Sequence, residues 1–224
     1  MTAPKAALIV GATGVVGRHC LDELLQAGRY ARIVAIGRRS TGKKHSKLAE
    51  IVLPLDRLGD IRAPDIGPID DVFCCLGTTQ KNAGSQPAFR HIEVEFPRAS
   101  ARLAKANGAT HIALVSSLGA DSRSANFYLK VKGEVEAAVT AEGLDSVSIF
   151  RPSLLLGDRE EFRWKEKLSE PLLRGLGVFM IGSARALRPI LAVHVARAMV
   201  EVATAPLPGT TIYGSDRIAA IAAA

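Results

Sequence analysis

Short apolar runs alternate along the chain with longer stretches in which apolar residues recur at helical spacing. Runs of this kind, apolar throughout and often ending in glycine, are typical of strands buried on both faces. They predict strands at Ala6–Val10, Arg32–Ile36, Ile51–Leu55, Asp71–Leu76, His111–Val115 and Ser146–Phe150. Helical spacing predicts helices at Gly14–Ala27, with Gly28 as a C-terminal stop, at Phe89–Ala106 and at about Asn126–Ala141. The alternation indicates parallel βαβ units, and so a doubly wound α/β fold with a mostly parallel sheet and helices on both faces.

The pattern changes after residue 150. An amphipathic helix is predicted at Ala192–Thr204 and an edge strand at Thr210–Tyr213. No linker or internal repeat divides the chain, so we expect one domain over residues 1–224. Within it, residues 1–150 form a dinucleotide-binding core and residues 151–224 a smaller substrate-side elaboration.

The segment Asp158–Gly182 is densely charged in its first part and rich in glycine in its second. It follows the last strand of the predicted core, where flexible elements commonly close over a substrate and exclude water. We expect a mobile lid here; a fixed helix capping the sheet is the alternative.

Composition supports a folded domain. The chain has 224 residues, of which 48% are hydrophobic and 23% charged, enough to build and cover a core. No apolar run approaches the roughly 20 residues that a membrane span needs, and the run after Lys5 leaves no room for a signal peptide. The three cysteines form neither a disulfide framework nor a zinc motif, which predicts buried free thiols and no metal site. We therefore expect a cytoplasmic location.

The net charge of +7 comes partly from one cluster, Arg38–Lys47, which holds five basic residues and no acid. A basic surface attracts polyanions, but no DNA-reading motif or RNA-type aromatic platform accompanies this cluster. A small phosphorylated ligand explains the cluster with fewer assumptions than a nucleic acid.

A glycine-rich string connects the first strand to the first helix: Gly11, Ala12, Thr13, Gly14, Val15, Val16 and Gly17. In this context glycines permit a tight turn and let backbone N–H groups approach a pyrophosphate at the helix N-terminus. No Gly-Lys-Ser/Thr follows, which excludes a P-loop. The string predicts a dinucleotide-binding loop.

The residues at the end of the second strand predict which cofactor binds. An acid there usually binds the ribose 2′-hydroxyl of NAD, whereas an arginine accommodates the 2′-phosphate of NADP. Arg38 and Arg39 follow the strand without any acid, so we predict NADP(H) over NAD(H). Further cofactor contacts are expected at other strand ends, from Asp56 near the adenine and from Leu76, Gly77 and Thr78 near a ribose. A turn carboxylate without a ligand is an equal alternative for Asp56.

Tyr128 and Lys132 stand at i and i+4, one above the other on the predicted third helix. A carbonyl reductase needs a proton donor for the oxygen that gains charge as hydride reaches carbon. A tyrosine can donate that proton, and a neighbouring ammonium favours its ionised form. A hydroxyl of Ser116 or Ser117, at the end of the fifth strand, can orient the substrate oxygen. We expect Tyr128 and Lys132 to contact the cofactor as well.

These motifs resemble the short-chain dehydrogenase/reductase superfamily, in its atypical or extended-like branch, and within it the HIV Tat-interacting oxidoreductase-like proteins. The resemblance extends from the glycine loop through Phe73–Thr79, Ser116–Asp121 and Tyr128–Glu136 to Phe150–Arg159. It implies a Rossmann fold, NADP(H), the usual reductase roles for Ser, Tyr and Lys, and nicotinamide contacts from Arg151, Pro152 and Ser153. One departure is Glu93, which stands where related reductases carry an asparagine that helps a proton relay.

The sequence therefore predicts an NADP(H)-dependent oxidoreductase acting on a carbonyl or alcohol, or an epimerase-type relative that uses the cofactor transiently. The alternative is a non-catalytic NADP(H)-binding sensor that contacts a protein partner. A homodimer is also possible, with the predicted helices at Phe89–Ala106 and about Asn126–Ala141 as candidate faces.

Overall fold

A seven-stranded sheet in the order β3-β2-β1-β4-β5-β6-β9 forms the centre of the molecule, and every neighbouring pair is parallel. The structure is a computed structural model that describes residues 4–61, 63–156 and 188–224. The strands of the sheet are β1 (Lys5–Val10), β2 (Tyr30–Gly37), β3 (Leu48–Val52), β4 (Asp71–Cys74), β5 (His111–Val115), β6 (Ser146–Arg151) and β9 (Gly209–Gly214). A separate parallel pair joins β7 (Leu155–Leu156) to β8 (Ile190–Leu191).

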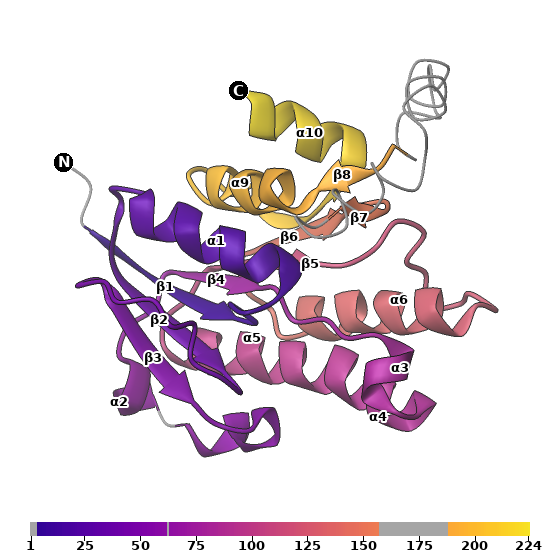
Figure 1. Ribbon diagram of the computed structural model, residues 1–224, viewed down its shortest axis with the longest axis horizontal. Coiled ribbons are helices and arrows are strands. Elements are labelled where there is room, and N and C mark those ends of the chain that lie inside the picture. Colours follow the sequence, from indigo (N-terminus) through magenta and orange to yellow (C-terminus); the bar gives the residue numbers. More distant parts are fainter. Residues whose placement is uncertain (1–3, 62, 157–187) are drawn as a thin grey trace.

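Helices cover both faces of this sheet (Figure 1). One face carries α1 (Val15–Gln26), α9 (Ala192–Val202) and α10 (Ser215–Ala223). The other carries α5 (Phe96–Ala106) and α6 (Phe127–Thr140), with the short helices α2 (Ala63–Ile66), α3 (Gln80–Ala83) and α4 (Gln86–Arg90). This confirms the predicted doubly wound α/β fold.

Successive residues of a strand divide between two cores, one under each helical layer. In β1, Ala7 and Ile9 belong to the cluster below α1 and α9, whereas Leu8 and Val10 belong to the cluster below α5 and α6. A strand with side chains buried on both faces must be apolar at every position, which explains the unbroken runs in the sequence.

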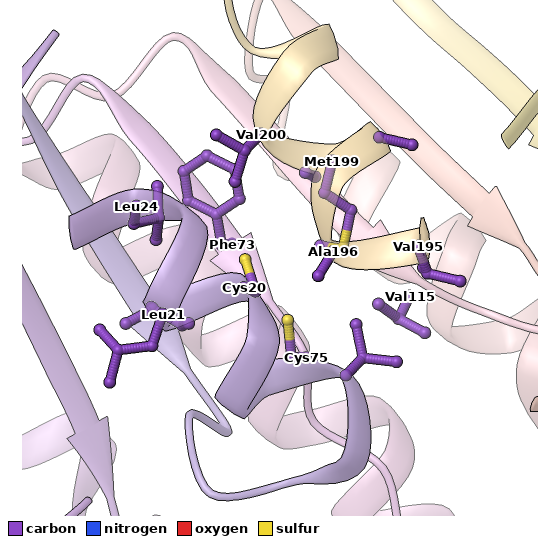
Figure 2. Packing of buried hydrophobic residues seen from close by; sticks show 14 of the residues in the cluster. Cys20, Leu21, Leu24, Phe73, Cys75, Val115, Val195, Ala196, Met199 and Val200 are labelled. Atoms are coloured by element: carbon purple, nitrogen blue, oxygen red, sulfur yellow. The ribbon is translucent and has the colours of Figure 1, made fainter. Parts of the chain in front are cut away.

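The layer of α1 and α9 is packed with small and medium side chains (Figure 2). Cys20 of α1 and Cys75, which follows β4, point toward each other beside Met199 of α9. All three cysteines of the chain are buried and free, as predicted. A hydrogen bond with Cys20 and burial together raise the pKa of Cys75 well above its ordinary value.

Several predicted boundaries were wrong, and three of them have an explanation in the local structure. The third strand begins and ends about three residues earlier than predicted, because Pro54 cannot donate to a ladder and a 3-10 helix, Leu55–Asp60, starts directly after it. Helix α1 ends at Gln26 with Ala27 as its cap, and Gly28 does not adopt the left-handed conformation of a glycine stop. The apolar segment after Phe89 is helical but contains a π-helical turn, His91–Glu95, between α4 and α5.

The predicted edge strand and the helix before it are confirmed as β9 and α9. Helices α3 and α10 were missed: α3 lies in a stretch predicted as loop, and α10 in an alanine-rich tail with little periodicity. The predicted lid, residues 158–182, lies outside the described residues.

Candidate active site at the carboxyl edge of the sheet

The strand order reverses between β1 and β4, and the carboxyl ends of these strands open the crevice where doubly wound sheets bind ligands. Gly11 follows β1 with φ +86°, and a Cβ there would lie 2.7 Å from the carbonyl carbon of Cys75. A Cβ on Gly17 would lie 2.0 Å from the oxygen of Gly11. Close backbone packing of loop, strand and helix therefore requires glycine at both positions.

The N-terminus of α1 suits an anion. Its cap residue, Gly14, provides no side-chain cap, and the first turn holds no acid. The N–H groups of the first turn have no intrahelical acceptor and, with the helix dipole, favour a negative ligand. Thr13 is exposed beside them, and Val15 exposes 48% of its surface. The loop thus fits the pyrophosphate of a dinucleotide.

A shallow pocket lies between this loop and the ends of β2 and β3. Its lining residues are Ala12, Thr13, Ala35, Ile36, Gly37, Arg39, Thr41, Glu50, Ile51 and Val52. Arg39 lines the pocket, while Arg38 is exposed at the same turn. Asp56 is exposed in the 3-10 helix, beyond the pocket lining.

Glu50 is an acid in this pocket that the sequence analysis missed. Its carboxylate accepts hydrogen bonds from Ser40 Oγ and from the backbone N–H of Thr41, both at 2.7 Å. Burial opposes ionisation, but these bonds outweigh it and lower the pKa of Glu50. On the other side of the loop, Lys43 pairs with Asp22 of α1 at 2.6 Å. The basic loop is therefore anchored from both β3 and α1.

Helix α6 places Tyr128 and Lys132 on the side facing the π-helical turn. Asn126 caps α6 by accepting the N–H of Leu129 at 3.1 Å. The Tyr128 ring packs against Phe89, and Lys132 Nζ lies 5.9 Å from the centre of that ring. The predicted i, i+4 juxtaposition is therefore present in the structure.

The Lys132 ammonium is buried and paired with an acid. Its Nζ lies 2.5 Å from Oε2 of Glu93, and the other oxygen of Glu93 accepts the backbone N–H of Thr78 at 2.6 Å. Burial would lower the pKa of Lys132, but the charge and the hydrogen bond of Glu93 outweigh it and raise that pKa. Thr78, with Leu76 and Gly77, continues from β4 and lies at the same edge.

The two strand-end serines have different environments. Ser116 is buried and donates to Glu136 of α6, which also receives two hydrogen bonds from Arg151. The hydrogen bond to Glu136 outweighs desolvation and raises the pKa of Arg151. Ser117 is half-buried, and its Oγ has a long 3.4 Å contact with the oxygen of Leu118. The Ser117 hydroxyl therefore makes the weaker hydrogen bond of the two serines and is the more available to a ligand.

The segment after β6 meets the serine turn. The oxygen of Pro152 accepts the N–H of Leu118 at 2.9 Å, and Ser153 bonds through its N–H to Ser215 Oγ and through its hydroxyl to the oxygen of Arg188. The side chain of Arg151 is turned to Glu136, so any cofactor contact from Arg151 would come from its backbone.

Glu50, Glu93 and Glu136 are acids of the site to which sequence reasoning assigned no role. Glu93 had a signal, since it stands at the place of the relay asparagine; Glu50 had none, because its strand gave no motif. Among the described residues no helix combines the length and apolarity that a bilayer crossing requires. The same residues bring no three potential metal-binding side chains together.

The comparisons with known proteins agree with this arrangement. A sequence model of the NAD(P)H-binding family matches residues 11–172. Protein HTATIP2 of Rattus norvegicus is 39% identical over 175 residues, which cover 77% of this chain and 72% of that protein. The mitochondrial protein fmp52 of Aspergillus niger is 32% identical over 218 residues, covering 94% of this chain and 92% of that protein. Its name places that relative in mitochondria, which does not fit a plainly cytoplasmic location for the whole group.

Solved structures confirm the fold. MoeE5 in complex with UDP-glucose and NAD aligns with a TM-score of 0.67 at 18% identity, covering 97% of this chain and 81% of that chain. WbmH of Bordetella bronchiseptica in complex with NAD⁺ aligns with a TM-score of 0.68 at 17% identity, covering 95% of this chain and 76% of that chain. At such identity the likeness establishes the Rossmann-type architecture alone.

Proposed function

The chain belongs to the NAD(P)H-binding family, and from that premise we propose that it is an NADP(H)-dependent oxidoreductase of the short-chain dehydrogenase/reductase type. Its substrate would be a small carbonyl compound or alcohol, and Tyr128 would be the acid/base group.

One observation carries the proposal. Tyr128 and Lys132 lie next to each other on α6, with Nζ 5.9 Å from the ring centre, and α6 follows the strand-end serines in the chain. Glu93 joins Lys132 to Thr78, which follows β4, one of the two strands that open the nucleotide crevice. The residues that we propose for proton transfer and for nucleotide binding therefore lie at one edge of the sheet.

The bound nicotinamide would supply or accept the hydride. The glycine loop and the Arg38–Arg39 turn would hold the phosphates, and Ser117 would donate a hydrogen bond to the substrate oxygen. In reduction, the O–H bond of Tyr128 breaks as the O–H bond of the alcohol forms, and the phenolate regains its proton from water. Lys132 stabilises the phenolate during that interval.

Replacing Tyr128 by phenylalanine tests the mechanism. Tyr128→Phe removes the proton donor and keeps the ring packed on Phe89, so NADPH affinity should stay within about threefold. Turnover of any carbonyl substrate found by screening NADPH oxidation should fall by roughly 10²-fold or more. Tyr213→Phe, which removes a hydroxyl from a buried tyrosine stacked on Phe150, is the control and should retain turnover. Wild-type turnover in Tyr128→Phe would refute this role.

A second candidate is a non-catalytic NADP(H) sensor. It is favoured by the pairing of Lys132 with Glu93, which engages the ammonium that the proposed mechanism uses. A sensor would bind NADPH, keep its function in Tyr128→Phe and turn over none of the carbonyl compounds screened.

A further inference from the structure

Glu93 lies in the π-helical turn His91–Glu95, the one departure from α-helical winding between α4 and α5. π-Helical turns inside α-helices are uncommon and often occur at functional sites. Glu93 in this turn is 2% exposed, whereas Glu95 in the same turn is half-buried and lines a groove with Arg90 and His91.

Both oxygens of the Glu93 carboxylate have partners in the site, Lys132 Nζ at 2.5 Å and the Thr78 N–H at 2.6 Å. Isolated buried acids are costly, so this carboxylate is retained as the partner of a buried cation. The other groups facing Lys132 are the Tyr128 phenol on α6 and the Cys74 thiol at the end of β4. Burial raises the pKa of Cys74 to about 12, so this thiol adds no charge at neutral pH.

The charges in this neighbourhood therefore nearly cancel. An ammonium alone would favour a phenolate at Tyr128, but a carboxylate bonded to that ammonium removes much of its effect.

Building on the proposed function, we propose that Glu93 is the positioning residue of the proton-transfer pair. Its carboxylate fixes Lys132 Nζ beside Tyr128, ties it to the Thr78 backbone at the nucleotide edge, and offsets the ammonium charge.

A spectroscopic titration tests this without a known substrate. The tyrosinate absorbance due to Tyr128 is obtained by subtracting the Tyr128→Phe signal in each background. In Glu93→Gln, which keeps the size and an acceptor for Thr78, that absorbance should appear about one pH unit lower than in the wild type, because a nearby negative charge is gone. In Lys132→Met it should appear at higher pH.

Glu95→Gln is the matched control, since it removes the same charge from the same turn but outside the site; its titration should follow the wild type. Opposite shifts in Glu93→Gln and Lys132→Met support charge compensation, which a purely structural role would not produce. The proposal would be overturned if the tyrosinate absorbance of Glu93→Gln appeared at the wild-type pH or at a higher pH, or if Glu95→Gln shifted it by the same amount as Glu93→Gln. If Glu93→Gln does not fold, Glu93→Asp replaces it in the experiment. Because Glu93→Asp keeps the negative charge, its tyrosinate absorbance should appear at the same pH as in the wild type. A shift of one pH unit or more to lower pH in Glu93→Asp would overturn the proposal.

With a substrate in hand, Glu93→Gln should shift the pH profile of carbonyl reduction to lower pH, with NADPH affinity changed less than turnover. Absence of all turnover, together with the expected titration shifts, would reject the oxidoreductase function while leaving the charge compensation intact.

Discussion

Arg39 and Glu50 both line the pocket at the ends of β2 and β3, and the role of each depends on what its side chain already binds. A free carboxylate here could accept a ribose 2′-hydroxyl, as in NAD-binding proteins. Glu50, however, is bonded to Ser40 and Thr41, so it holds the arginine turn in place. This residue pair is consistent with our preference for NADP(H).

Removing either arginine tests that preference. Arg39→Ala should weaken NADPH binding by about 10- to 100-fold, the range expected for a lost charge-assisted hydrogen bond, and NADH binding by less than threefold. Arg38→Ala should act in the same direction. Lys44→Ala, in the same loop but not among the pocket-lining residues, is the control for general charge. Equal losses for both nucleotides, measured by fluorescence titration, would contradict the assignment.

At the scale of elements, α6 is held to the sheet by contacts that use the side chain of Ser116 but not that of Ser117. A Cβ on Gly133 would lie 2.0 Å from the backbone N of Ser122, so α6 packs directly on the loop that follows β5. Glu136 of α6 binds Ser116 after β5 and Arg151 at the end of β6. These contacts fix α6, and with it Tyr128, relative to both strands.

Replacing each serine by alanine should therefore have a different effect: one substitution should lower stability and the other should lower turnover. Ser116→Ala removes a buried hydrogen bond to a carboxylate and should lower the free energy of unfolding by about 2 kcal/mol. Ser117→Ala should leave that free energy within about 0.5 kcal/mol and lower turnover at least tenfold, since its hydroxyl is the one available to a substrate. Denaturant unfolding and steady-state rates on both variants check this; the reverse pattern would assign the catalytic role to Ser116.

At the scale of the whole molecule, a buried polar network joins the strands at the edge of the sheet that lies opposite the candidate site. Asp71, which begins β4, accepts hydrogen bonds from Tyr30 at 2.8 Å and Lys5 at 3.1 Å, and lies 3.2 Å from His111 Nδ1. His111 also contacts Ser148 of β6 at 3.1 Å. Burial would raise the pKa of Asp71, but these hydrogen bonds and the nearby positive charge outweigh it and lower that pKa. The carboxylate of Asp71 thus connects four strands directly, and His111 extends the network to a fifth.

The network predicts how stability depends on pH. Because the pKa of Asp71 is lower in the folded than in the unfolded chain, its stabilisation is present above about pH 4 and is lost as the pH falls through the folded-state pKa. Asp71→Asn should lower the free energy of unfolding at pH 7 by about 2 kcal/mol or more, and its deficit relative to the wild type should shrink toward pH 3. Urea unfolding between pH 3 and 7 measures this, with the exposed Asp60→Asn as control. A constant deficit across that range would exclude the assigned role of Asp71.

The sequence by itself determined the class of fold and the elements of the site. Apolar runs such as Ala6–Val10 specify buried parallel strands because both faces of such a strand must be apolar, and the glycine loop is local because a tight turn needs glycine at fixed spacing. The Tyr128–Lys132 pair is also local, since helix geometry alone brings residues i and i+4 together.

Only the tertiary structure decided which groups meet across elements. Glu93 pairs with Lys132, which is 39 residues away in the sequence. The hydrogen bond to Glu136 distinguishes Ser116 from its neighbour Ser117. Glu50 binds the arginine turn from the neighbouring strand. These contacts depend on strand order and on one π-helical turn, which arise from packing between segments far apart in the chain. Hydrophobic periodicity encodes which residues are buried, but the partner of a buried charge is set by the fold that surrounds it.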